Sequence, residues 1–179
     1  MSVLSWVASW TSQMSPNTKP AVKVAGAAIA VAAATWLAIA IPVVAQYEGY
    51  SGKPYRDSVG VLTICYGATA ADGVNFSKTY SKAECEQMLG KDLQKYEAQI
   101  RPCIPKIDTF PPHRIAALVS FAYNLGPRAL CGPVGRYLNA GNVTAGCNAM
   151  LAYNHAGGRV LAGLTTRRQS ERALCLRND

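Results

Sequence analysis

The chain has 179 residues, of which 50% are hydrophobic and 16% are charged, and its formal net charge is +8. This length accommodates one domain of typical size with its own core. A basic surface attracts polyanions in general, but the chain has no run of five like charges and no zinc-finger spacing, so nucleic acid is not expected as a partner.

The first feature along the chain is an uncharged apolar segment of 22 residues at 24–45. A helix of this length rises about 33 Å, which is enough to cross a hydrocarbon core of about 30 Å. Lys19 and Lys23 precede the segment and no acid does, so the positive-inside rule places the N-terminus in the cytoplasm. We therefore expect a cytoplasmic tail at 1–23, a membrane segment at 24–45 and a soluble domain at 46–179.

The composition of this segment is unusual for a permanent anchor. Ten of its residues are Ala and only eight are Ile, Leu or Val, and each of the latter favours the bilayer by only about 0.3–0.6 kcal/mol. An anchor of this kind can be expected to leave the membrane. Two alternatives stay open: a signal peptide cleaved after Val43-Val44-Ala45, and a buried core helix of a soluble protein.

A small sheet and several helices are predicted after the apolar segment. Residues 48–79 are rich in Gly, Tyr, Thr and Val and carry turn signals, which predicts a small antiparallel hairpin sheet. Ser81 and Glu84 form a capping box at the start of an amphipathic helix of about five turns, which Pro102 closes.

The segment 113–125 has almost no polar face, which predicts a central buried helix. Further helices are predicted around 133–140, 143–153 and 165–177. A small sheet followed by many helices is an α+β arrangement, with a cleft expected between the two parts.

Six cysteines follow the apolar segment, and none of them forms a CxxC pair. They are Cys65, Cys85, Cys103, Cys131, Cys147 and Cys175. An even number on one side of a predicted membrane segment favours disulfides in an oxidising compartment, with 15 possible pairings. The alternative is buried free thiols in a cytosolic protein.

Two acids and a threonine are the candidate chemical groups. Glu48, Asp57 and Thr63 lie in the run Glu-Gly-Tyr-Ser-Gly-Lys-Pro-Tyr-Arg-Asp-Ser-Val-Gly-Val-Leu-Thr-Ile-Cys-Tyr-Gly at 48–67. An acid at the end of a helix and a second acid in the following hairpin can face each other across a groove, as glycoside hydrolysis requires.

This run resembles the catalytic segment of phage-type lysozymes, glycoside hydrolase family 24, in which the strand continues as Thr-Ile-Cys/Gly-Tyr-Gly. Two further blocks agree with the family, Ser-Phe-Ala-Tyr-Asn-Leu-Gly at 120–126 and the stretch 156–175 that ends the domain. With the apolar segment in front, the chain resembles signal-anchor-release endolysins of double-stranded DNA phages. The resemblance implies a lysozyme-like fold.

The resemblance also implies the reaction, hydrolysis of the β-1,4 bond between N-acetylmuramic acid and N-acetylglucosamine in peptidoglycan. Glu48 would be the general acid, kept protonated by apolar neighbours. Asp57 would be the base toward the attacking water, and Thr63 would hold that water in an inverting mechanism that needs no cofactor or metal. Tyr66 and Asn124 match positions that line the saccharide groove, although Asn124 is equally explained as a helix-end cap.

The chain departs from the family at Ala68, where His is common, so an electrostatic tie between sheet and helices is missing and a disulfide is expected to replace it. One set of pairs consistent with the resemblance is Cys65–Cys85, Cys103–Cys131 and Cys147–Cys175. Arg167 and Arg168 could contact the polymer, but charged residues on a terminal helix more often form a solvated face, which is the interpretation adopted for them.

As a whole, the resemblance predicts a monomer that host secretion machinery exports and residues 24–45 tether to the periplasmic face of the host inner membrane. The tethered protein would be inactive and would act on peptidoglycan after release into the periplasm. Because residues 24–45 contain no cysteine, activation would require this segment to refold into the helix that presents Glu48. The alternatives are an exported muramidase with a cleaved signal peptide and a non-catalytic, membrane-tethered wall-binding protein.

Overall fold

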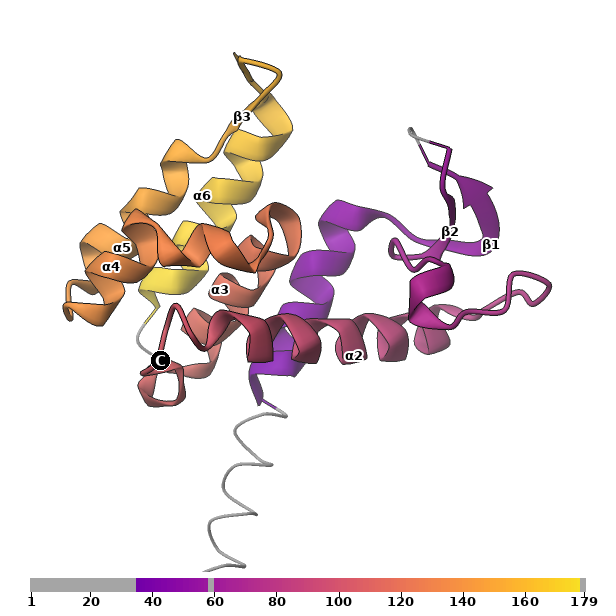
Figure 1. Cartoon of the computed structure of the whole chain (residues 1–179), viewed down its shortest axis with the longest axis horizontal. Helices are drawn as coiled ribbons and strands as arrows, with labels where there is room; N and C mark the ends of the chain where they lie inside the picture. Colours follow the sequence, from indigo (N-terminus) through magenta and orange to yellow (C-terminus); the bar gives the residue numbers. More distant parts are fainter. Residues whose placement is uncertain (1–34, 58–59, 178–179) are drawn as a thin grey trace, which may run out of the picture. The chain divides into compact units, whose positions relative to one another are not determined.

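The computed structural model describes residues 35–57 and 60–177, which belong to one compact unit, Thr35–Asp179. The predicted tail at 1–23 and residues 24–34 of the predicted membrane segment lie outside the described residues. The helices and strands (Figure 1) are a helix over 35–48, β1 (Ser51–Arg56), β2 (Leu62–Cys65), α2 (Lys82–Ile100), α3 (Pro112–Leu125), α4 (Pro133–Asn139), α5 (Val143–Ala149), β3 (His155–Ala156), β4 (Arg159–Val160) and α6 (Ala162–Leu176). Short 3-10 helices connect them: η2 (Ala70–Asp72), η3 (Ile107–Thr109), η4 (Pro127–Cys131) and η5 (Met150–Ala152).

The helix over 35–48, called helix 35–48 below, packs into the core of the domain. Trp36, Ala40 and Val44 are buried, with 6%, 0% and 0% of their surface exposed. A spacing of four residues places them on one face of the helix. Gly90 on α2 allows a close approach, because a Cβ atom there would lie 3.3 Å from Cδ1 of Ile41. Residues 35–45 of the predicted membrane segment are therefore part of the folded domain in this conformation.

The described residues include no helix with both the length and the apolar character of a membrane span.

The predicted hairpin sheet is confirmed. β1 and β2 are antiparallel, with Tyr55 opposite Thr63. Asp57 closes the connection, because its N–H donates to the Val61 carbonyl at 3.0 Å and its Oδ1 accepts from the Val61 N–H at 2.8 Å. The strand ends at Cys65, so the sheet is shorter than the sequence indicated.

The predicted helices form the body of the domain. The capping box at the start of α2 is confirmed, because the Ser81 side chain accepts from the Glu84 N–H and Glu84 accepts from the Ser81 N–H. Every residue of α3 from His113 to Ala122 is buried, which confirms the central helix, and α3 contacts both α2 and α6 (Figure 1). A mostly helical body with a small antiparallel hairpin is the predicted α+β architecture.

The structure contains a second hairpin, β3–β4, that the sequence analysis missed. Its two central residues, Gly157 and Gly158, have φ of 56° and 74°, the positive values that a two-residue hairpin turn requires. The Gly-Gly pair was the available signal, but strands of two residues are too short to show an alternating pattern. α6 also begins at Ala162, three residues before the predicted start.

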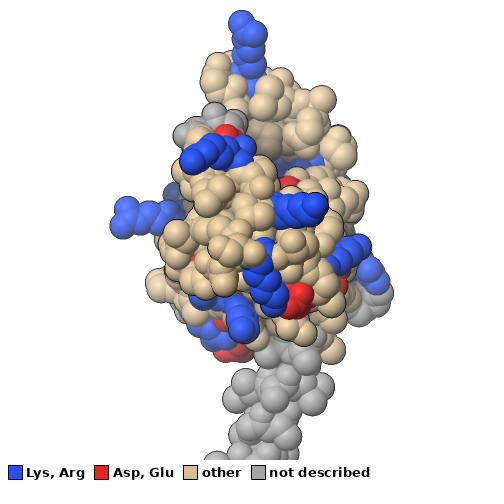
Figure 2. All heavy atoms as spheres, turned by 90° about the vertical axis from the view of Figure 1, so that its right-hand side faces the viewer, with Lys and Arg blue, Asp and Glu red and all other residues tan. Residues whose placement is uncertain are grey.

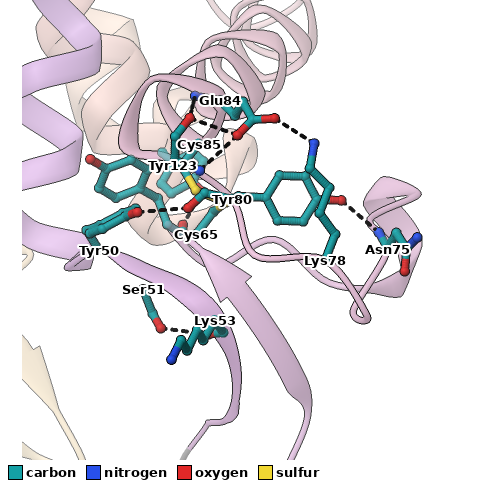
Figure 3. Close-up of a disulfide and its surroundings, with 12 residues drawn as sticks. Tyr50, Ser51, Lys53, Cys65, Asn75, Lys78, Tyr80, Glu84, Cys85 and Tyr123 are labelled. Carbon is teal, nitrogen blue, oxygen red and sulfur yellow. Dashed lines mark hydrogen bonds and ion pairs between the residues drawn. A yellow bond between two sulfur atoms is a disulfide. The ribbon is translucent and has the colours of Figure 1, made fainter.

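Three disulfides are present, Cys65–Cys85, Cys103–Cys131 and Cys147–Cys175, the same pairs that were expected. The first joins the end of β2 to α2 (Figure 3). An ion pair also links η2 to α2, because Nζ of Lys95 lies 3.7 Å from Oδ1 of Asp72, and Lys95 lies 2.7 Å from Oδ1 of Asp92 on its own helix. The link between the hairpin sheet itself and α2 is the disulfide.

Cys65 has φ of 59°, the left-handed conformation. A residue with a Cβ atom loses about 1–2 kcal/mol in that conformation, whereas Gly adopts it freely. Cys65 tolerates the conformation while forming the disulfide.

The left-handed conformation at Cys65 predicts a difference in stability between two variants that lack the Cys65–Cys85 disulfide. Cys65→Ala/Cys85→Ala and Cys65→Gly/Cys85→Ala should each lose about 3 kcal/mol of unfolding free energy with the disulfide. The Gly variant should be the more stable of the two by about 1 kcal/mol, as measured by urea unfolding. Equal stability would mean that the left-handed conformation at Cys65 carries no cost.

Candidate active site

Glu48 is the last residue of helix 35–48. Its side chain is 26% exposed, and it lines a cavity of about 260 Å³ together with Gly49, Tyr50, Ser51 and Tyr55. The buried face of helix 35–48 fixes the position of this carboxyl group, because Val44 lies one helical turn before it and is fully buried. The sequence therefore places an acid at the end of a rigid element, beside an open cavity.

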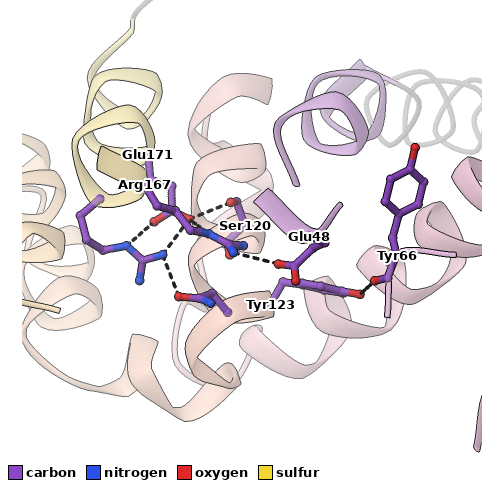
Figure 4. A network of polar contacts seen from close by, with 8 residues as sticks. Glu48, Tyr66, Ser120, Tyr123, Arg167 and Glu171 are labelled. Atoms are coloured by element: carbon purple, nitrogen blue, oxygen red, sulfur yellow. Dashed lines mark hydrogen bonds and ion pairs between the residues drawn. The ribbon is translucent and has the colours of Figure 1, made fainter. Parts of the chain in front are cut away.

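A guanidinium group holds the carboxylate of Glu48. Nη1 of Arg167, on α6, donates to Oε1 of Glu48 at 2.8 Å (Figure 4). Apolar neighbours were expected around Glu48, but the group in contact with its carboxylate is a buried cation. Since Arg167 is only 4% exposed, this contact is screened little by water.

Arg167 and Arg168 do not form the solvated face that was predicted. Arg168 and Glu171 are both fully buried, and the two charges form an ion pair between Nε and Oε2 at 2.8 Å. Burial raises the pKa of Glu171, and the nearby guanidinium groups and the Ser120 hydroxyl oppose that effect. Because a guanidinium lies within 3.2 Å of each carboxylate oxygen, we treat Glu171 as ionised at neutral pH.

Asp57 and Thr63 lie together in the β1–β2 hairpin, joined through Val61. The Thr63 side chain is buried, and its hydroxyl donates to the Val61 carbonyl at 3.0 Å. Asp57 accepts from the N–H of the same residue. Neither of them is among the residues that line the cavity beside Glu48, so the roles expected for Asp57 and Thr63 stay predictions.

The two predicted groove residues have different surroundings. Tyr66 is 3% exposed, and its ring lies 5.8 Å from the ring of Tyr50, measured between centroids. It therefore offers little surface to a saccharide in this conformation. Asn124 is exposed near the end of α3, and its Oδ1 accepts from Nη2 of Arg168 at 3.1 Å. Both assignments to the saccharide groove stay predictions.

Tyr123 was missed as a residue near the site. Its hydroxyl donates to the Tyr66 carbonyl at 3.2 Å, and it lines a second cavity, of about 220 Å³, with Lys95, Tyr96 and Asp92 among others. Burial, followed by the charge of Glu48, raises the pKa of Tyr123. The block Ser-Phe-Ala-Tyr-Asn-Leu-Gly contained this tyrosine, but only its neighbour Asn124 was singled out.

Within residues 35–57 and 60–177, no three His, Cys, Asp or Glu side chains are arranged to hold a metal ion.

Comparisons with known proteins agree on one family. The family model for phage lysozyme matches residues 45–171. The SAR-endolysin of Bacteriophage PS119 is 43% identical over 130 residues, which cover 72% of this chain and 76% of the relative. The SAR-endolysin of Pseudomonas phage phiKMV is 35% identical over 144 residues, 78% of this chain and 88% of the relative. The crystal structure of a P22 lysozyme mutant superposes with a TM-score of 0.67 and 32% identity, covering 77% of this chain and 95% of that one.

Proposed function

The chain belongs to the phage lysozyme family, and we propose that Glu48 and Asp57 are the general acid and general base of an inverting reaction. As a member of this family it is an endolysin with muramidase activity in host lysis. The bond that it cuts is the β-1,4 bond between N-acetylmuramic acid and N-acetylglucosamine. The observation that carries the proposal is the carboxyl group of Glu48, fixed at a helix end beside a cavity.

The hairpin geometry supports distinct roles for Asp57 and Thr63. The Thr63 hydroxyl uses its hydrogen on the Val61 carbonyl, so toward a water molecule its oxygen can only accept. A water between the two residues would donate one hydrogen to Thr63 and the other to Asp57, which leaves its lone pair free to attack the anomeric carbon. Inversion requires about 6.5–9.5 Å between the two carboxyl groups to make room for this water.

The basic surface supports an anionic polymer as the substrate. From residue 46 onward the chain has 16 Lys and Arg against 10 acids. Figure 2 shows Lys and Arg side chains spread over the face that it displays, with fewer Asp and Glu among them. Such a surface attracts an anionic cell-wall polymer at long range and raises the rate of encounter.

The Glu48→Gln variant tests the catalytic assignment. Because a general acid contributes about 10²–10⁴-fold, the variant should clear suspensions of outer-membrane-permeabilised Gram-negative cells at least 100-fold more slowly than the wild type. The matched control is Glu86→Gln, which removes an exposed carboxylate from α2 and should clear at the wild-type rate. If Glu48→Gln cleared normally, the alternative of a non-catalytic wall-binding protein would be favoured.

The membrane tether is a second part of the proposal. Residues 24–45 would anchor the exported chain in the host inner membrane, and release would deliver it to the periplasm. Residues 35–45 are relevant to the tether, because Trp36, Ala40 and Val44 lie in the protein core. The same side chains cannot occupy lipid and core at once, so a tethered chain would lack the packing that positions Glu48. This exclusion supports an inactive tethered state.

The triple variant Ala28→Leu/Ala30→Leu/Ala32→Leu tests the tether without altering helix 35–48. Each Leu favours the bilayer by about 0.3–0.6 kcal/mol, so the protein should stay in the membrane fraction longer and lysis should be delayed. Ala30→Ser should have the opposite effect on release. Unchanged timing and fractionation would contradict release from the membrane.

The mass of the N-terminus in the released wild-type protein separates the remaining alternative. A chain beginning at Met1, or at Ser2 after Met removal, agrees with release without cleavage. A chain beginning near Gln46 would show a cleaved signal peptide instead.

A further inference from the structure

A compact group of buried charges on α6 continues from the active site into the core. Arg167, Arg168 and Glu171 are 4%, 0% and 0% exposed. Removing a charge from water costs several kcal/mol even after relaxation, so buried ion pairs are poor devices for stability alone. Their position behind Glu48 suggests that they serve the reaction.

Glu171 lies at the centre of this group (Figure 4). Its Oε1 accepts from the Ser120 hydroxyl at 2.7 Å, from Nε of Arg167 at 3.2 Å and from Nη2 of Arg168 at 3.1 Å. Its Oε2 lies 2.8 Å from Nε of Arg168. A carboxylate with this many donors has one fixed position, and it can fix the groups that bind it.

Three groups besides Glu48 contact the guanidinium group of Arg167 and fix its orientation. Its Nε is bound by Glu171, its Nη2 donates to the Ser120 carbonyl at 3.3 Å, and its guanidinium carbon lies 5.0 Å from the centroid of the Tyr47 ring. The guanidinium is planar and rigid, so fixing Nε and Nη2 also fixes Nη1. The remaining donor then points at Glu48.

The charges of the group nearly cancel when Glu48 is ionised. Arg167 and Arg168 bring two positive charges, and Glu48 and Glu171 bring two negative ones. A lone guanidinium beside an acid favours the ionised form of that acid, which is the wrong form for a general acid. Glu171 binds the same guanidinium from the other side and offsets part of its field.

We propose that Glu171 is a positioning residue for the general acid: it orients Arg167 toward Glu48 and balances the charge that Arg167 brings to the active site. This inference rests on the proposed role of Glu48 as the general acid. It assigns a function to a residue 123 positions away in the sequence that never touches the substrate.

Other titratable groups near Glu48 come from each element around it. They are Tyr47 on its own helix, Tyr55 on β1, Tyr96 on α2, Tyr123 on α3 and Arg167 on α6. Burial first, and negative charges including that of Glu48 after it, raise the pKa of Tyr96 and of Tyr123. Tyr96 and Tyr123 therefore stay neutral at working pH, and the charged group in direct contact with Glu48 is Arg167 of α6.

The test is the pH profile of clearing by the full-length, released protein on permeabilised Gram-negative cells. Glu171→Gln keeps the size of the side chain and removes its charge. We expect the alkaline limb of the profile to move to lower pH by about 1 unit, and clearing near neutral pH to fall about tenfold. Arg168→Gln removes a positive charge from the same group and should move the alkaline limb in the opposite direction.

Two further variants separate positioning from a purely structural role. Ser120→Ala removes a hydrogen bond to Glu171 without changing the charge of the group, so it should lower the thermal midpoint but leave the pH profile in place. Glu171→Gln/Arg168→Gln removes one charge of each sign and should return the profile toward that of the wild type. If Glu171→Gln does not fold, the predicted shift of the alkaline limb to higher pH in Arg168→Gln is the test.

Folded Glu171→Gln and Arg168→Gln single variants whose profiles coincide with the wild-type profile would overturn the inference, as would shifts of the same sign for these two variants. The proposed function fails by a different result, namely normal clearing by Glu48→Gln. The two failures are therefore distinguishable.

Discussion

The packing of helix 35–48 into the domain is the constraint on which the rest of the site depends. Trp36, Ala40 and Val44 are buried on one face, and they set where the helix ends and therefore where Glu48 lies. From that position the carboxyl group meets Arg167, which α6 supplies from the other end of the chain. The two segments reach each other only because the central helix α3 supports α6 and carries Ser120, which binds both Arg167 and Glu171.

This dependence gives a physical account of the proposed control of activity by the membrane tether. If residues 24–45 lie in a bilayer, lipid contacts the face of helix 35–48 that otherwise packs into the core. The charged side chains of α6 are then no longer covered by this helix and become accessible to water. Arg167 would then lack Glu48, and Glu171 would be exposed to water through the open side. The same event that releases the segment would close the core, complete the group of charges and position the acid. No thiol in the segment is needed for this sequence of events.

Much of this architecture was predictable from local signals, and the rest was hidden by distance along the chain. The capping box of Ser81 and Glu84, the apolar run of α3 and the segment from Glu48 to Thr63 are contiguous patterns, and the structure has each element where the pattern indicated. Arg167 and Arg168 were misread because charged residues on a terminal helix usually face water. Arg167 contacts Glu48, which lies 119 residues away in the sequence, and no local sequence pattern predicts such a contact. The β3–β4 hairpin was missed because its strands have only two residues each.

The central claim is that residues predicted to span the membrane become a core helix of the active enzyme. Hydrogen exchange at the backbone amides of residues 39–48, measured in the released and active protein, tests it most directly. The account predicts that these amides exchange as slowly as those of α3, because both helices would open only when the core opens. Rapid exchange at residues 39–48 in a protein that is fully active would contradict the account.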